Sequence, residues 1–309
     1  MYYCQPVFAK GSGLGNRIFP WARCRIFSSV NDIQMLSPQW VTGRIGPLLR
    51  GGIDITCYKN QILLLDLFKK KEGDLGGMRK MLLQSMAVKE IEPDTFKLIQ
   101  IEPPSKDVII VFQGDKNHFN DLYGWENFIL EELHTITKAK WLKLVDSRKN
   151  IPIGINVRLG NDFKKATSES DFYTKGAVKT PLQWFVESLL VIRESVGFPA
   201  KAFVVSDGKE EDLQPLLSLE NVTFVRPGCA ISDLLVLSKA KILIASGGSS
   251  FSAWASFLGQ MPTISHPGQS LSWFKINNRN GYYVGEFNPT SPPQPFLEQI
   301  KSLIASFQG

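Results

Sequence analysis

The chain has 309 residues and a formal net charge of +6, with 43% hydrophobic and 21% charged residues. This length suits two domains, and the composition is that of a folded globular protein, which excludes disorder of the whole chain. Residues 69–71 form the only run of three cations, and no basic stripe is interleaved with aromatic residues. We therefore expect no nucleic-acid binding. An anionic small molecule, or loose peripheral attachment to an anionic membrane, fits the charge equally well.

The cysteines are widely spaced and form no C-x-x-C pair: Cys4, Cys24, Cys57 and Cys229. This spacing predicts buried free thiols in a reducing compartment rather than a disulfide scaffold or a zinc site. The first residues lack a positive segment followed by an apolar stretch, and no window approaches the ~20 apolar residues of a membrane span. We expect a soluble, cytoplasmic protein. Nothing in the sequence bears on its oligomeric state.

The first half of the chain shows a loose alternation of strands and helices. We expect strands at 6–9 and 108–112, helices at 16–29 and 125–140, and a glycine-rich loop at 11–15. The run at 108–112 is continuously apolar, as in a buried parallel strand. A charged segment at 138–149 followed by Pro152 predicts a domain boundary near residue 150.

The alternation is sharper in the second half, which predicts a parallel sheet covered on both faces and an α/β fold. Expected strands are 153–157, 202–205, 222–225, 242–245 and 263–266. Expected helices are 180–195, 210–218, 232–239, 251–259 and 292–307. The Asn- and Gly-rich stretch 268–290 is expected to be a loop, with a composition that suits a crossover between domains.

A glycine-rich loop, 11–16, follows the first strand and opens the first helix. It superficially matches a dinucleotide-binding fingerprint, but the third glycine of that pattern is replaced by Asn16, which disfavours an NAD enzyme. Small residues let the backbone approach a ligand, and the helix that follows favours a negative or polar group. A plain tight turn explains the same residues.

A second loop of small residues, 247–252, also connects a strand to a helix. Its backbone N–H groups and hydroxyls suit a phosphate or a ribose at the end of a parallel strand, which favours a site over a simple serine cap. Arg158 follows the apolar strand 153–157 directly, where its planar fork suits a phosphate. Asp162 either orients Arg158 or touches the ligand, although an ordinary surface pair explains both residues as well.

Several catalytic patterns are missing from the sequence. It contains no D-x-D pair for a metal-bridged diphosphate, no paired-histidine arrangement, no G-x-S-x-G elbow and no P-loop. No metal is therefore expected, and the hydrolase and P-loop interpretations are weak. If a diphosphate leaves during the reaction, cationic side chains and helix ends must stabilise it.

Five segments in order resemble a known family. Residues 13–19, G-L-G-N-R-I-F, are similar to the G-L-G-N-Q-M-F opening of bacterial and animal α-1,2-fucosyltransferases. Residues 153–163, I-G-I-N-V-R-L-G-N-D-F, resemble the H-x-R-R-x-D motif shared by α-1,2-, α-1,6- and protein O-fucosyltransferases. Residues 233–258 resemble the D-x-x-x-L-S and S-x-F-x-W block. Shorter matches at 112–119 and 205–207 complete a similarity that runs from residue 11 to about 260.

The resemblance implies a GT-B fold of two facing Rossmann-like domains and metal-independent, inverting transfer of fucose from GDP-fucose to a glycan hydroxyl, with no cofactor besides the donor. The implied domains are 1–150 on the acceptor side and 151–290 on the donor side, with a helix in 291–309 that packs back on the first domain. Implied catalytic residues are Arg158, Asn16 and Asp162. Implied donor-binding residues are Asn156, Arg158, Asp207, Asp233, Ser249, Ser250 and Phe251.

Further roles follow from the same resemblance. Arg158 would grip the β-phosphate, and Asp233 would bind the guanine edge. Residues facing the sugar and the acceptor would be Gly13, Gly15, Asn16 and Arg17. Variable acceptor loops are expected at 44–52 and 73–79.

This chain also departs from the family pattern. Asn156 replaces the motif histidine, Leu159 replaces the second arginine, and Asn161 looks inserted before Asp162. These changes leave open a different nucleotide-sugar donor or an inactive, glycan-binding relative. The general base is also open, with Asp162 and Asp207 as candidates.

Overall fold

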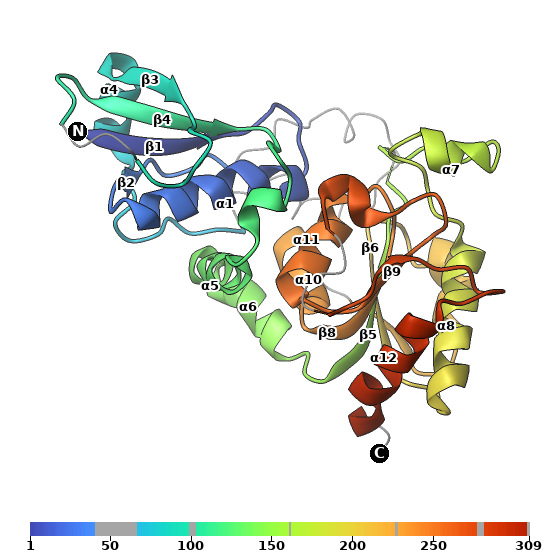
Figure 1. Cartoon of the computed structure of the whole chain (residues 1–309). Coiled ribbons are helices and arrows are strands. Elements are labelled where there is room, and N and C mark those ends of the chain that lie inside the picture. Colours follow the sequence, from blue (N-terminus) through green and yellow to red (C-terminus); the bar gives the residue numbers. More distant parts are fainter. Residues whose placement is uncertain (41–66, 99–102, 161, 226–227, 277–280, 308–309) are drawn as a thin grey trace. The chain divides into compact units, whose positions relative to one another are not determined.

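The computed structural model describes residues 1–40, 67–98, 103–160, 162–225, 228–276 and 281–307. The chain divides into two compact units, Met1–Leu142 and Lys143–Gly309 (Figure 1). The division falls inside helix α6 (Ala139–Asp146), a few residues before the boundary expected at 150. The expected acceptor loop at 44–52, Cys57 and Asn161 lie outside the described residues.

A parallel sheet with the order β2-β1-β4-β3 forms the centre of the first unit. Its strands are β1 (Tyr2–Val7), β2 (Gln34–Met35), β3 (Val88–Ile91) and β4 (Val108–Gln113). Its helices are α1 (Leu14–Val30), α4 (Gly77–Met86), η2 (Asn120–Leu122) and α5 (Glu126–Ile136), followed by α6. Helix α1 packs against β1 and β4, and nearly all of its residues from Leu14 to Phe27 are buried.

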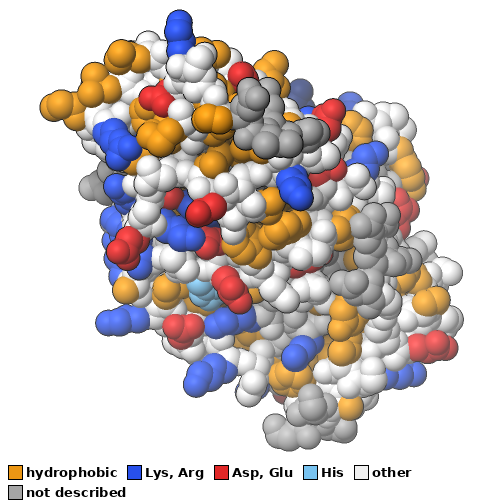
Figure 2. Space-filling view, turned by 60° about the vertical axis from the view of Figure 1, so that its left-hand side comes forward, with side chains coloured by type: hydrophobic (Ala, Val, Ile, Leu, Met, Phe, Trp, Pro, Cys, Tyr) orange, Lys and Arg blue, Asp and Glu red, His pale blue; other side chains and the backbone are white. Residues whose placement is uncertain are grey.

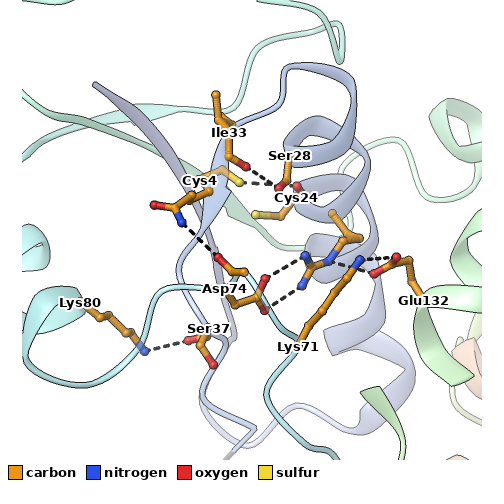
Figure 3. A network of polar contacts seen from close by, with 12 residues as sticks. Cys4, Cys24, Ser28, Ile33, Ser37, Lys71, Asp74, Lys80 and Glu132 are labelled. Atoms are coloured by element: carbon orange, nitrogen blue, oxygen red, sulfur yellow. Dashed lines mark hydrogen bonds and ion pairs between the residues drawn. The ribbon is translucent and has the colours of Figure 1, made fainter. Parts of the chain in front are cut away.

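Helix α1 carries arginines that are buried and paired with acidic residues. Arg25 donates from Nη1 to Asp74 Oδ1 at 2.9 Å and from Nη2 to Asp74 Oδ2 at 2.8 Å. Its Nε lies 3.4 Å from Glu132, which also pairs with Lys71 (Figure 3). Such a fork-to-carboxylate pair is strong because both hydrogen bonds are charge-assisted. The network ties α1, α5 and the segment before α4 together, with Arg25 and Asp74 buried at its centre and Lys71 half-buried at its margin.

The second unit contains a six-stranded parallel sheet with the order β10-β9-β8-β5-β6-β7. Its strands are β5 (Ile151–Val157), β6 (Ala202–Ser206), β7 (Val222–Phe224), β8 (Ala240–Ala245), β9 (Thr263–Ser265) and β10 (Val284–Glu286). Its helices are α7 (Ser170–Thr174), α8 (Leu182–Val196), η3 (Glu211–Leu213), α9 (Gln214–Leu217), α10 (Ala230–Leu237), α11 (Ser250–Gly259), η4 (Leu271–Phe274), α12 (Gln294–Ile304) and η5 (Ala305–Phe307). Counted from β5, this order is that of the dinucleotide-binding Rossmann sheet.

Both faces of the second sheet are covered by helices (Figure 1). Ile155 and Val157 of β5 join a buried core with residues of α8 and α12. On the opposite face of β5, a Cβ added at Gly154 would lie 3.2 Å from Leu237 in α10. Every residue of β5 is buried, as expected for a central parallel strand with helices on each side.

The expected α/β fold with parallel sheets is confirmed, and several elements differ from expectation. The C-terminal helix α12 packs within the second unit, where Phe296 and Ile300 are fully buried in the core beneath α8. The expected loop 268–290 contains β10, which extends the second sheet. The expected helix 125–140 is two helices, since Thr137 is extended at the C-terminus of α5.

The described thiols agree with the expectation from their spacing: Cys4, Cys24 and Cys229 are free and buried. Burial raises the pKa of Cys24 well above its usual value, and a hydrogen bond with Cys4 acts in the same direction. Burial likewise raises the pKa of Cys229 to about 11.

In the part of the chain that the structure describes, no helix has the length and apolar character needed to cross a membrane.

We predict that Asp74→Ala destabilises the first unit by about 3–5 kcal/mol, because it leaves the Arg25 guanidinium buried without its bidentate partner. Hydrogen exchange of the α1 amides measures this loss directly. The double variant Arg25→Leu/Asp74→Leu should lose less, since Glu132 keeps Lys71 as its partner. A double variant less stable than Asp74→Ala would contradict the assignment.

Candidate functional site

The second sheet changes direction between β5 and β8, which are adjacent although the strands β6 and β7 and the helices α7 to α10 lie between them in sequence. Successive connections leave this point toward opposite edges of the sheet, so the loops after β5 and β8 diverge at their carboxyl ends. In open α/β sheets, such a point forms a crevice that receives ligands. Arg158 and Ser246 are the first residues after these two strands.

Ser246 ties the ends of the two strands together. Its hydroxyl donates to the Asn156 carbonyl at 2.9 Å and accepts from the Arg158 backbone N–H at 2.9 Å. Its own backbone N–H also donates to the Asn156 carbonyl at 3.0 Å. The backbone of Arg158 is therefore fixed relative to β8 independently of the contacts that its side chain makes. Ser246 is only 1% exposed and was not predicted, although it directly precedes the expected serine loop.

The guanidinium of Arg158 lies between two aspartates. Its Nη1 is 2.7 Å from Asp207 Oδ2, and its Nη2 donates to Asp162 Oδ2 at 2.9 Å. The Cζ atom is 5.2 Å from the centroid of the Phe163 ring, within the range of a cation–π contact. The Nε donor is buried and has no hydrogen-bond partner among the described residues. The side chain is thus oriented on three sides, with Nε still available to a ligand.

Asp207 organises the loop that carries Arg158. Its Oδ1 accepts from the Leu159 N–H at 2.7 Å, and its Oδ2 accepts from the Gly160 N–H at 3.1 Å. A Cβ at Gly160 would lie 2.5 Å from Asp207 Oδ2, so only glycine lets the loop approach this closely. With both oxygens engaged, Asp207 is poorly placed to accept a substrate proton. Asp162, with a side chain 45% exposed, is the more accessible carboxylate.

The loop before α11 closes tightly against the neighbouring loops. Gly248 has a φ of +63°, and a Cβ there would lie 2.0 Å from the Gly176 carbonyl oxygen. A Cβ at Gly247 would lie 2.1 Å from the Gln269 side chain. The two glycines are therefore required by packing between loops, which is a different reason from the phosphate or ribose contact expected for this loop from the sequence.

Gln269 is a second buried residue that was not predicted. Its Oε1 accepts from the Thr180 hydroxyl at 2.7 Å, and its Nε2 donates to the Val178 carbonyl at 2.8 Å. It therefore joins the loop after β9 to the segment that precedes α8. An isolated glutamine in an irregular segment gives no pattern that a sequence can reveal.

Helix α11 begins at the same edge of the sheet and contains three of the predicted donor residues. Ser249 caps it by accepting from the Ser252 N–H at 3.3 Å. Ser250 and Phe251 are half-buried in its first turn. The helix N-terminus provides backbone N–H groups and a partial positive charge, which favour an anion.

Asn156 and Asp233 occupy different environments. Asn156 is 1% exposed on the face of β5 opposite Ile155, and its Oδ1 has no hydrogen-bond partner among the described residues. Asp233 is half-buried in α10, which begins at Ala230 rather than at the expected cap near residue 232. A Cβ at Gly228 would lie 2.1 Å from Asp233 Oδ1, so glycine makes room for this carboxylate. Helix α10 packs against both β5 and α11.

The remaining predicted residues belong to the first unit, at the start of α1. Gly13 is the N-cap residue and makes no side-chain cap, Gly15 is buried, and Asn16 is exposed in the first turn. Arg17 is only 2% exposed, and its Nε donates to the Ser12 carbonyl at 3.0 Å. Arg17 therefore supports the glycine loop from inside the unit, and of these four residues only Gly13 and Asn16 face solvent.

No group of three or more His, Cys, Asp or Glu side chains is placed to hold a metal ion within the described ranges. His266, which follows β9, lies between aromatic rings instead. Its ring centroid is 4.4 Å from that of Phe172 and 5.7 Å from that of Trp184, and its Nδ1 donates to the Pro267 carbonyl at 2.7 Å. This residue packs the loops at the carboxyl edge of the sheet.

Neither protein-family models nor curated proteins give a match to this chain. Among solved structures, it is similar to the fucosyltransferase NodZ from Bradyrhizobium, with 13% identity, a TM-score of 0.48 and coverage of 86% of this chain and 96% of that chain. POFUT1 gives 11% identity, a TM-score of 0.47 and coverages of 85% and 97%. A mutant of Arabidopsis thaliana FUT1 in complex with GDP gives 16% identity, a TM-score of 0.44 and coverage of 85% of this chain and 70% of that chain. These similarities are distant in sequence and partial in structure.

We predict that Gly248→Ala destabilises the second unit by more than Gly197→Ala. Both glycines have positive φ, but a Cβ at Gly197 meets nothing within 4 Å, whereas at Gly248 it meets a backbone oxygen. The Gly197 variant should cost about 1 kcal/mol from backbone strain alone, and the Gly248 variant about 3 kcal/mol or more. Denaturant unfolding of the two variants measures the difference, and equal losses would contradict the loop packing.

A further prediction concerns pH. Burial lowers the pKa of His266 below its usual value, an effect that the Pro267 carbonyl only partly offsets. The unfolded chain then binds the proton more readily, so stability rises with pH and is lost as pH falls through about 6.5. Replacing the ring by His266→Gln should flatten this slope in thermal unfolding measured across that range. An unchanged slope in the variant would assign the pH dependence to other groups.

Proposed function

We propose that the chain is a metal-independent, inverting glycosyltransferase that transfers fucose from GDP-fucose to a glycan hydroxyl. The observation that carries this proposal is the oriented Arg158 guanidinium at the β5–β8 crevice, where α11 also begins. A departing diphosphate needs positive charge held in place before the reaction, and this arrangement provides it without a metal. The proposal joins that geometry to the resemblance of the surrounding motifs.

The contacts of Arg158 indicate how it can change partners. Nη1 is held by Asp207, while Nη2 pairs with the more exposed Asp162. A phosphate that binds Nε and Nη2 as a bidentate pair replaces Asp162 alone and leaves the Asp207 anchor intact. Donor binding then releases the Asp162 carboxylate beside the reacting sugar. We therefore assign Asp162 as the general base.

Arg158, Asp162 and the N-terminus of α11 together account for each bond and proton that changes in the transfer step. The acceptor hydroxyl oxygen forms a bond to the anomeric carbon, while the bond between that carbon and the β-phosphate oxygen breaks. GDP leaves with both bonding electrons, and Arg158 with the α11 N-terminus stabilises its charge. The hydroxyl proton moves to Asp162. Attack on the side opposite the leaving group inverts the anomeric centre.

We assign the preference for a guanine nucleotide to Asp233 in α10 and Asn156 near the end of β5. The guanine edge presents adjacent N–H donors, which a carboxylate such as Asp233 accepts as a pair, whereas uracil presents no such pair. Asn156 contributes a buried amide whose Oδ1 is still available as an acceptor. Ser249, Ser250 and Phe251 are assigned to the phosphates and the ribose, and Gly13, Gly15 and Asn16 to the acceptor side.

The departures from the family motif are also consistent with two alternative functions, transfer from another nucleotide-sugar donor and glycan binding by an inactive relative. Leu159 occupies the position of the second motif arginine and packs under the loop, where a Cβ at Gly208 would lie 2.5 Å from its Cδ1. One cation is therefore missing, which leaves room for another donor or for an inactive relative that binds glycans. Thermal unfolding with GDP, UDP and CMP separates the donors, since a ligand at 100 times its Kd stabilises by about 2.7 kcal/mol.

We predict that Arg158→Ala lowers the rate of GDP release from GDP-fucose, with lactose-type acceptors, by at least about a hundredfold. Arg158→Lys should fall between this variant and the wild type, because it keeps the charge and loses the fork. Lys201→Ala serves as the control, since Lys201 is an exposed cation before β6, at the opposite edge of the sheet. Full activity in Arg158→Ala would overturn the proposal, and a wild type that releases no GDP would favour the inactive relative.

A further inference from the structure

Helix α4 in the first unit turns apolar side chains outward. Met78, Met81, Leu82 and Met86 are 78%, 69%, 55% and 79% exposed. Their spacing in the sequence places all four on one face of the helix. A surface helix normally buries such an apolar face against the core of its own domain. In α4 this face is exposed to solvent instead.

The opposite face of α4 holds this orientation in place. Leu83 packs in a buried cluster with Leu36 and Ile109, and Lys80 donates from Nζ to the Ser37 carbonyl at 2.8 Å. Turning the apolar face inward would break this hydrogen bond and expose Leu83. The exposed face is therefore a fixed part of the first unit.

The adjoining strand β3 continues the apolar area. It follows α4, lies at the edge of its sheet and exposes Ile91 at 79%. Ile91 is in register with Val111, on the face of the sheet where Leu83 of α4 packs. We call the side chains of Met78, Met81, Leu82, Met86 and Ile91 the α4–β3 surface. Figure 2 shows hydrophobic side chains gathered at the upper left of the view, with cationic and acidic side chains beside them. Clustered apolar exposure of this kind marks a docking surface, whereas single exposed residues do not.

The charge around the α4–β3 surface is positive. Residues 69–91 contain six Lys or Arg and three Asp or Glu. Asp74 is buried against Arg25, Lys80 is buried against the Ser37 carbonyl and Lys71 pairs with Glu132, so these three residues add no free charge. Arg79 and Lys89 are exposed beside the apolar side chains. Lys70 extends along the start of α4, where a Cβ at Gly76 would lie 3.4 Å from its Nζ. An anionic partner therefore complements the border of the apolar face.

We propose that the α4–β3 surface docks on the anionic face of a lipid bilayer, with its Met and Leu side chains among the acyl chains and its cations at the headgroups. Unbranched, polarizable methionines adapt to a fluid partner, and an apolar face with basic borders is typical of interfacial helices. Pairing of β3 with a second copy is a poorer fit, because the strand is short and carries Lys89 and Glu90. This inference does not depend on the proposed transferase activity.

Vesicle co-sedimentation of the full chain tests the proposal. We expect binding to phosphatidylcholine vesicles that contain phosphatidylglycerol, and much weaker binding to phosphatidylcholine alone or at high salt. Arg79→Glu/Lys89→Glu should weaken binding by more than about fivefold for each charge reversed. The variant Met78→Ser/Met81→Ser/Met86→Ser should weaken it at least tenfold, because all three side chains are solvent-exposed and available for insertion.

The matched control is Leu190→Ser, which removes an apolar side chain that is 47% exposed on α8 of the second unit. It should bind vesicles as the wild type does. Unchanged thermal unfolding of the methionine variant verifies that it is folded. Absence of vesicle binding, equal binding to neutral and anionic vesicles, or full binding by the methionine variant would each overturn the proposal. A concentration-dependent dimer that this variant abolishes, without vesicle binding, would assign the surface to a second copy instead.

Discussion

The carboxylate of Asp207 connects the loops on which the candidate site depends. It accepts hydrogen bonds from Leu159 and Gly160 and pairs with Arg158, so one side chain directly after β6 sets both the backbone and the guanidinium of the loop after β5. Ser246 fixes the same backbone from β8. Because the two anchors come from strands on either side of β5, the position of Arg158 follows from the order of the sheet. Moving any of these strands would move the cation.

The same constraint explains why glycines gather at this edge. Loops that must reach a common crevice from neighbouring strands approach each other within van der Waals distance, and a Cβ at Gly160 or Gly248 would collide with them. The site is thus built by close contact between loops, with few side chains that are free to move. Asp162 is the exception, since it is nearly half exposed and lies on the solvent side of Arg158. A preorganised cation beside a releasable carboxylate is the combination that inverting transfer requires.

The sequence predicts the parallel strands of the second unit well, because apolar runs bounded by small residues leave few alternatives. It places Arg158 at a strand end for the same reason. It does not reveal that Ser246 holds the backbone of Arg158 or that Asp207 pairs with its guanidinium, since both contacts depend on which strands are neighbours in the sheet. Helix α4 escapes prediction because its apolar residues face solvent, and periodicity is normally read as a buried face. The burial of Arg17 is equally hidden, as an arginine in a helix is expected outside.

The most direct test of the account is a crystal structure of the chain with GDP. We expect the diphosphate in the β5–β8 crevice, within hydrogen-bond distance of Arg158 Nε and Nη2 and of the first turn of α11. We also expect that Asp162 has left the guanidinium while Asp207 still pairs with it. GDP bound away from Arg158, or an Arg158 that still holds both aspartates beside bound GDP, would contradict it.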